Sequence, residues 1–262
     1  MFAKFKISIE NVREINKQIV SLQRFAQNDK SNPSISDEIK LLLENQEGII
    51  DGEKLKTEYF PTKGKKNYNV FISHSHGDID EIEKFAKKLE TRYGVRCFVD
   101  SMVWKNIATL QRKIDNAHKN PNGSLDYELV KQSTAHIHSL LSIALFEMID
   151  QCECCIFVQS DKSLALDFNE TRTLSPWIYE EIFYMNHTRK ILPERIPERK
   201  LFCALNENNR TDAQIKMSHI VDLSEFRDLI SAFPNADLQG DKFLNHLYWK
   251  SGLIEQMSYL WG

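Results

Sequence analysis

Short apolar runs alternate with amphipathic segments through the middle of the chain. The runs that read as strands are residues 68–73, 95–99, 154–158 and 201–205. Between the first two runs, residues 79–93 place apolar side chains on one helical face, and Gly94 follows as a stop signal. A strand, a helix and a strand in such close succession indicate a right-handed parallel crossover. The pattern therefore predicts an α/β fold with a mostly parallel sheet.

The same pattern divides the chain into three regions. Residues 1–66 are expected to form a helical N-terminal extension and a connector, because apolar residues recur at helical spacing from Val12 onward. Residues 67–230 form the α/β domain, with a long insertion at about 101–150 and a short fifth strand ending at 220–223. Residues 231–262 are expected to form a C-terminal helical segment.

Two helix starts carry clear signals. Ser175 is a good N-cap and Pro176 suits the first helical position, so Trp177 and Glu181 share one face of the following helix. Asp78 and Glu81 resemble a capping box before the helix at 79–93. A ring beside a carboxylate suits a nucleotide-like ligand, whereas a core tryptophan next to a solvated glutamate is the alternative.

Polar residues follow three of the predicted strands. They are Ser73, His74, Ser75 and His76 after the first strand, Asp100, Ser101 and Trp104 after the second, and 160–181 after the third. Parallel sheets bind ligands at the carboxyl ends of their strands, where the winding direction reverses. In the flavodoxin-like strand order 2-1-3-4-5, that point lies between the first and third predicted strands, and Glu181 would face it from its helix.

Composition narrows the function without identifying it. The formal net charge of -3 gives no electrostatic case for binding nucleic acid. The first residues lack a signal-peptide core, and no apolar run is long enough to cross a bilayer, so we expect a cytoplasmic protein without membrane contact. The five cysteines lie mostly in apolar runs, as is typical of buried, reduced thiols.

Three segments together resemble the motifs of the Toll/interleukin-1 receptor (TIR) domain family. The first-strand motif is residues 70–75, the second-strand motif is residues 97–101, and the WxxxE element runs from Trp177 to Glu181. The similarity covers about residues 67–230 and is greatest to bacterial TIR proteins of antiviral defence, including those of Thoeris systems. It implies a flavodoxin-like TIR domain with a mostly parallel five-stranded sheet.

The resemblance also implies an activity. Enzymatic TIR domains break the N-glycosidic bond of NAD with the glutamate of WxxxE, which here is Glu181. The residues implied to bind the substrate are Ser73, His74, Ser75, His76, Asp100, Ser101, Trp104 and Trp177. NAD is the substrate, and no cofactor or metal is needed, because a carboxylate can stabilise the oxocarbenium-like ribose while the cationic nicotinamide departs. The product, whether ADP-ribose, a cyclic isomer or a conjugate, is left open.

Partners follow from the same resemblance. We expect a homo-oligomer on activation, a phage-derived trigger, and a downstream effector that reads the nucleotide product. The insertion at about 101–150 alters the loop that commonly governs TIR assembly, so the geometry of the oligomer is not implied.

Two other functions fit parts of the sequence. Many TIR domains are non-catalytic adaptors that recruit partners through contacts between like domains. Alternatively, His74, His76 and Asp78 resemble part of a metallo-β-lactamase-type motif, which would make the protein a metal-dependent hydrolase. The position where that motif continues with histidine is instead Ile79 and Asp80, which argues against the metal reading.

Overall fold

The computed structural model describes residues 1–17, 51–60, 62, 68–99, 107–117, 119–120, 122–165, 171–196, 218–234 and 238–254. The chain forms two compact units. One comprises Met1–Ile19, Lys66–Met102 and Met148–Gly262, and the other comprises Val20–Lys65 and Val103–Glu147. The parallel sheet and all of the described candidate site residues belong to the first unit.

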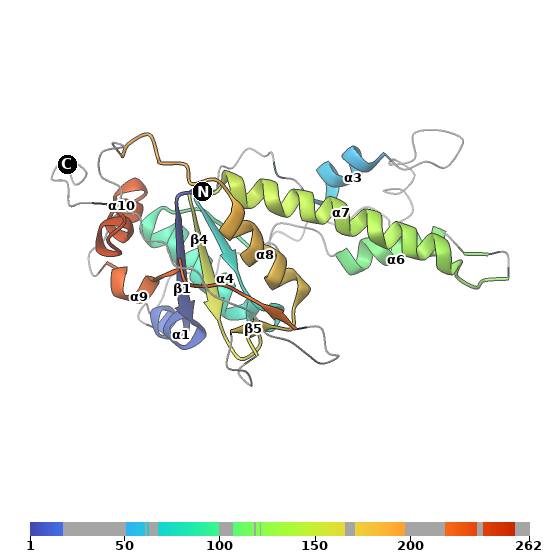
Figure 1. The fold of residues 1–262 in the computed structure, drawn as a ribbon, viewed down its shortest axis with the longest axis horizontal. Helices are drawn as coiled ribbons and strands as arrows, with labels where there is room; N and C mark the ends of the chain where they lie inside the picture. The colour runs from blue at the N-terminus through green and yellow to red at the C-terminus, as the bar shows by residue number, and fades with distance from the viewer. Residues whose placement is uncertain are drawn as a thin grey trace. The chain divides into compact units, whose positions relative to one another are not determined.

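The first unit is built on a five-stranded, fully parallel sheet (Figure 1). Its strands are β1 (Ala3–Ser8), β2 (Val70–Ser73), β3 (Cys97–Phe98), β4 (Cys154–Gln159) and β7 (Arg227–Asp228), in the order β3-β2-β4-β1-β7. The predicted α/β class and the predicted neighbours of the first strand are therefore confirmed. The strand after residue 95 lies on one side of β2, and the strand that begins at Cys154 lies on the other.

The fourth position of the sheet holds an unexpected strand. Residues 3–8 form β1, which pairs in parallel with β4 from Ala3↔Cys154 to Ser8↔Gln159. The prediction of a helical extension was wrong for this segment, although α1 (Ile9–Lys17) is helical as expected. Alternation explains the strand, because Ala3, Phe5 and Ile7 are buried on one face while the lysines between them face the other.

Two further strand predictions need comment. Residues 201–205 lie outside the described part of the chain, so that strand stays a prediction. The strand predicted to end at 220–223 is not in the parallel sheet. His219–Ile220 forms β6, which pairs in antiparallel fashion with β5 (Arg172–Thr173), and β7 takes the edge position beside β1.

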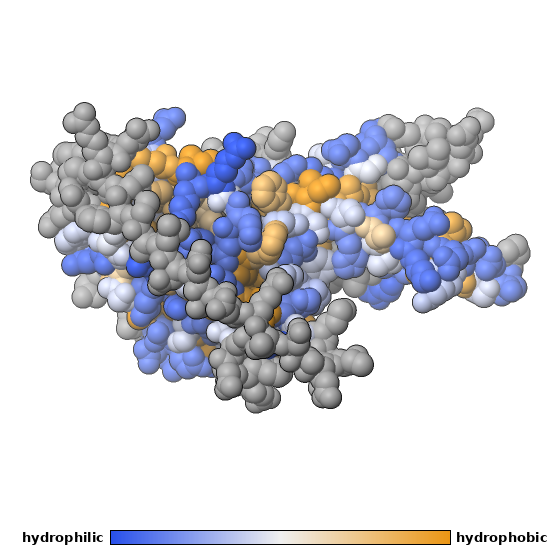
Figure 2. Space-filling model, viewed as in Figure 1, coloured by the Kyte–Doolittle hydropathy of each residue, from blue (hydrophilic) through white to orange (hydrophobic). Residues whose placement is uncertain are grey.

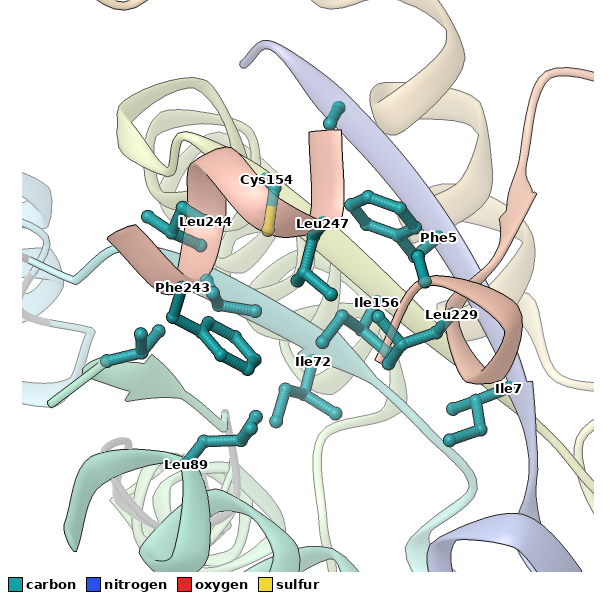
Figure 3. Close-up of a cluster of buried hydrophobic side chains, with 14 of the residues drawn as sticks. Phe5, Ile7, Ile72, Leu89, Cys154, Ile156, Leu229, Phe243, Leu244 and Leu247 are labelled. Carbon is teal, nitrogen blue, oxygen red and sulfur yellow. The ribbon is translucent and has the colours of Figure 1, made fainter. Parts of the chain in front are cut away.

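One face of the sheet carries the main hydrophobic core (Figure 3). Alternate strand residues such as Phe5, Ile72 and Ile156 pack there against α1, α4 (Ile79–Tyr93), α9 (Leu229–Ala232) and α10 (Asp241–Lys250). The predicted C-terminal helical segment is thus helical at α10. Phe243, Leu244, Leu247 and Tyr248 of α10 are all buried in this core.

The helix α4 ends as predicted and begins differently. Gly94 has a φ of 64°, the left-handed conformation that glycine supplies at a helix C-terminus. Asp78 occupies the N-cap position, but its side chain makes no capping hydrogen bond. Glu81 bonds to Asn16 and Lys84 instead of reaching back, so the predicted capping box does not form.

The opposite face of the sheet carries α8 (Pro176–His187). Lys4 of β1 donates to Asn186 of α8 at 2.9 Å, and Ser73 of β2 also bonds to this helix. Ser175 caps the helix by accepting from the backbone N–H of Ile178 at 3.3 Å, and Pro176 is its first residue. Both predicted start signals are confirmed.

The second unit contains three of the described helices. It contains α3 (Gly52–Tyr59), α6 (Ile107–Ala117) and most of α7 (Tyr127–Gln151), whose last turn belongs to the first unit. The segment around 52–59 was predicted as a connector, but Asp51 caps it as a helix by accepting from the N–H groups of Glu53 and Lys54. Lys56 of α3 pairs with Glu147 of α7 at 2.6 Å.

Candidate functional site

The strands β2 and β4 are neighbours whose helices lie on opposite faces of the sheet. The helix after β2 is α4, which packs in the main core, and the helix after β4 is α8, which packs on the other face. Such a pair marks the point where the winding direction changes, and open α/β sheets bind ligands at the carboxyl ends of these strands. The predicted change of winding direction between these two strands is therefore confirmed, and a ligand site at their carboxyl ends stays a prediction.

Glu181 reaches the end of β2. The hydroxyl of Ser73 donates to Glu181 Oε2 at 2.5 Å, across 108 positions of sequence. Ser73 is 0% exposed and Glu181 is 6% exposed, so a carboxylate is held within the protein at the sheet's carboxyl edge. Acidic side chains are almost never buried without partners, and this one faces a candidate ligand site.

A cysteine lies within electrostatic range of this carboxylate. Cys155, on β4, points to the same face of the sheet as Ser73. Burial raises the pKa of the Cys155 thiol well above its usual value, and the charge of Glu181 adds to the rise. The thiol therefore stays protonated at neutral pH, which removes it as a nucleophile.

The other predicted residues are only partly gathered here. His74 is buried, and its Nδ1 lies 3.4 Å from the carbonyl oxygen of Ile72. Ser75 is half-buried and His76 is exposed. Trp177 is half-buried on α8, one turn before Glu181. Asp100, Ser101 and Trp104 lie outside the described residues, so their predicted contacts with the substrate stay predictions.

Ser160 and Lys162 tie together the loops that follow β2 and β4. The carboxylate of Asp78 is buried, and it accepts from Ser160 Oγ at 2.6 Å and from Lys162 Nζ at 3.0 Å. Lys162 also donates to the carbonyl oxygen of Gly77 at 2.5 Å. These bonds explain why Asp78 does not cap α4, since both carboxylate oxygens are used across the edge of the sheet.

Lys162 was not predicted as a partner of Asp78. The positions of the two residues could have indicated the pair, because a lysine after one strand and an aspartate after its neighbour can meet at the shared carboxyl edge. Gly77 makes the contact possible, because a Cβ at this position would lie 2.7 Å from Lys162 Cδ. The aliphatic stem of Lys162 therefore lies directly on the glycine.

Removing this contact should lower stability moderately. Lys162→Met keeps the stem and loses the ion pair, and Gly77→Ala displaces the stem. Each should cost about 1–2 kcal/mol, because Asp78 is buried but keeps its hydrogen bond from Ser160. Because both changes break one contact, the double variant should cost little more than the larger single change. Urea denaturation measures all three.

The control for this cycle is Lys87→Met. Lys87 is an exposed lysine of α4 that pairs with Glu83 at 4.0 Å on its own helix. Its effect should add to that of Gly77→Ala. Strict additivity between Lys162→Met and Gly77→Ala would show that Lys162 does not lie on Gly77 in solution.

The structure does not gather the residues of the metal-hydrolase reading. Among the described residues, no group of three or more His, Cys, Asp or Glu side chains could hold a metal ion. His74, His76 and Asp78 all belong to that part of the chain, and the carboxylate of Asp78 is bonded to Ser160 and Lys162. The donor set that the sequence motif indicated is thus not assembled.

Aromatic side chains line the outer side of α8. Tyr179 and Phe183 are exposed, and Tyr179 stacks on His219 with 4.3 Å between ring centroids. On the face drawn in Figure 2, hydrophobic surface occurs in separate patches among hydrophilic side chains. No helix within the described residues is both long and apolar enough to span a membrane.

No protein-family description, curated protein or solved structure matched the chain. The function is therefore argued from the site itself.

Proposed function

We propose that the protein is a TIR-type NAD glycohydrolase or ADP-ribosyl cyclase that cleaves the bond between nicotinamide and ribose. The observation that carries the proposal is the position of Glu181, whose carboxylate is buried beside Ser73 at the winding reversal of a parallel sheet. Glu181 is the glutamate of the WxxxE element, and Ser73 of the first-strand motif bonds to it. Parallel sheets bind ligands at this edge.

Cleavage of the N-glycosidic bond of NAD requires mainly a negative charge close to the ribose. Nicotinamide leaves NAD as a neutral molecule and takes the electron pair of the N-glycosidic bond, so the leaving group needs no general acid. Positive charge then develops on the ribose, and Glu181 is proposed to stabilise it and to hold the ribose hydroxyls. Water attack gives ADP-ribose, and attack by a nitrogen of the adenine gives a cyclic isomer.

The neighbouring groups fit this division of work. Cys155 is protonated and buried, so it is not proposed as a nucleophile. The proposed chemistry is assigned to Glu181. Trp177, one turn earlier on α8, supplies a ring that can stack on a flat base. His76 adds an exposed polar group to the loop that follows β2.

The test is release of nicotinamide from NAD by the purified protein, followed by chromatography with detection of both products. Self-association is part of the proposal, so specific activity should be measured over a wide range of protein concentrations beside the scattering mass. A specific activity that increases with assembly supports a homo-oligomeric active form. If no nicotinamide forms in the monomeric or the assembled protein, the adaptor function replaces the enzymatic one.

A further inference from the structure

The resemblance to TIR enzymes assigned Ser73 to substrate binding, but its environment indicates a different role. Its side chain is fully buried, and its hydroxyl is directed at Glu181 Oε2. A group that is 0% exposed and already donates to the carboxylate is poorly placed to contact a substrate. The question is then what the hydroxyl does for Glu181.

We propose that Ser73 is a positioning residue that fixes the carboxylate of Glu181 for the proposed NAD cleavage. This inference rests on the proposed function, and it adds a residue that acts through Glu181 without touching the substrate. The hydroxyl orients one carboxylate oxygen, Oε2, and thereby sets the direction of the whole carboxylate.

The two ends of the bond are anchored in rigid elements. Ser73 is the last residue of β2, which is hydrogen-bonded to β3 on one side and β4 on the other, and its Cα is in register with Phe157. Glu181 lies on α8, beside the buried Ile178 and Ile182. A helix fixes the Cα of a glutamate but leaves three side-chain torsions, so a bond from a neighbouring strand restricts where the carboxylate points.

The direction of the bond suits the proposed chemistry. The hydroxyl of Ser73 donates to Glu181 Oε2. A hydroxyl that donates to a carboxylate stabilises its negative charge, and the developing ribose cation needs that charge. Ser73 thus restricts the orientation of the carboxylate and supports its negative charge.

The variant Ser73→Ala tests this role. kcat should fall about 10- to 100-fold, as expected when one hydrogen bond to a charged group is lost. KM should stay within about threefold, because ground-state binding of NAD does not involve the hydroxyl. The matched control is Ser8→Ala, since Ser8 ends β1, another parallel strand of the same sheet, and its hydroxyl accepts from the N–H of Asn11 at 3.2 Å. The control should leave kcat unchanged.

A double variant separates positioning from a general structural effect. In the Glu181→Gln background, Ser73→Ala should change the residual rate by less than about twofold, because its partner is already disabled. A full additional loss in the double variant, or an unchanged or increased kcat in Ser73→Ala alone, would overturn the proposal. So would a rise in KM without a fall in kcat, which would return Ser73 to substrate binding.

Stability measurements keep the inference separate from the proposed function. The stability cycle uses Glu181→Ala in place of Glu181→Gln, because the amide oxygen could still accept from Ser73. Coupling between positions 73 and 181 in urea should change the folding equilibrium about fivefold or more. If positions 73 and 181 are coupled but the wild-type protein cleaves no NAD, the NAD activity and the positioning role of Ser73 in it are refuted, while the hydrogen bond stands. Activity without coupling would refute the positioning role alone.

Discussion

Glu181→Gln should lower the rate of nicotinamide release from NAD by about a hundredfold or more, because the amide keeps the shape of the side chain and loses its charge. The fold should survive, since the amide oxygen can still accept from Ser73 and the buried neighbours Ile178 and Ile182 are unchanged. Initial rates by chromatography, with thermal unfolding measured on the same samples, give both quantities.

The matched control is Glu180→Gln. Glu180 precedes Glu181 by one residue, which turns it about 100° around the helix, and its Oε1 accepts from Tyr184 Oη at 2.9 Å. An amide preserves that bond, so activity should change by less than about threefold. An equal loss in both variants, or full activity in Glu181→Gln, would remove Glu181 from the mechanism.

A large loss of stability is expected from Phe5→Ala. Phe5 is fully buried in the middle of β1, and its ring stacks on Tyr248 of α10 with 6.4 Å between centroids. Truncation of a buried phenylalanine costs about 3–5 kcal/mol, which is a large share of the roughly 5–15 kcal/mol that stabilises a typical domain. The free energy of unfolding from urea titrations measures it.

Lys6→Ala provides the comparison for that loss. Lys6 is the next residue of β1, is half-buried and points to the other face. Its replacement should cost less than about 1 kcal/mol. Similar small effects from both changes would mean that β1 does not belong to the sheet. The sequence-based prediction of a helical extension would then be restored for this segment.

Sequence patterns identified the strands and helices whose signals are local. The buried run at Cys154, the helix ended by Gly94, and the start at Ser175 and Pro176 all depend on neighbouring residues, and all three are confirmed. The strand β1 was missed although its residues alternate, because the helical spacing from Val12 onward was taken to describe the whole N-terminal region. Lys4 is in fact buried, and it pairs with Glu225 at 2.6 Å from a distant part of the chain.

In the candidate site, too, local signals predicted positions and long-range bonds were missed. The spacing of Trp177 and Glu181 placed the carboxylate on α8, and the rule for parallel sheets placed it near the end of β2, where Ser73 donates to it. The bonds of Asp78 were not predictable, because local capping signals indicated one partner while Ser160 and Lys162 compete from 82 and 84 positions away. Long-range competition of this kind leaves no trace in a short sequence window.

The position of β1 has a consequence for how the chain is made. Its hydrogen-bonding partner β4 begins at Cys154, about 150 residues later, so the ribosome releases β1 long before its partner exists. During that interval the backbone N–H and C=O groups of residues 3–8 are unpaired on both sides, and such a segment can pair with other nascent chains. We expect the lysines at positions 4 and 6 to reduce aggregation during this interval, since like charges on an unpaired strand repel other copies of it until β4 is synthesised.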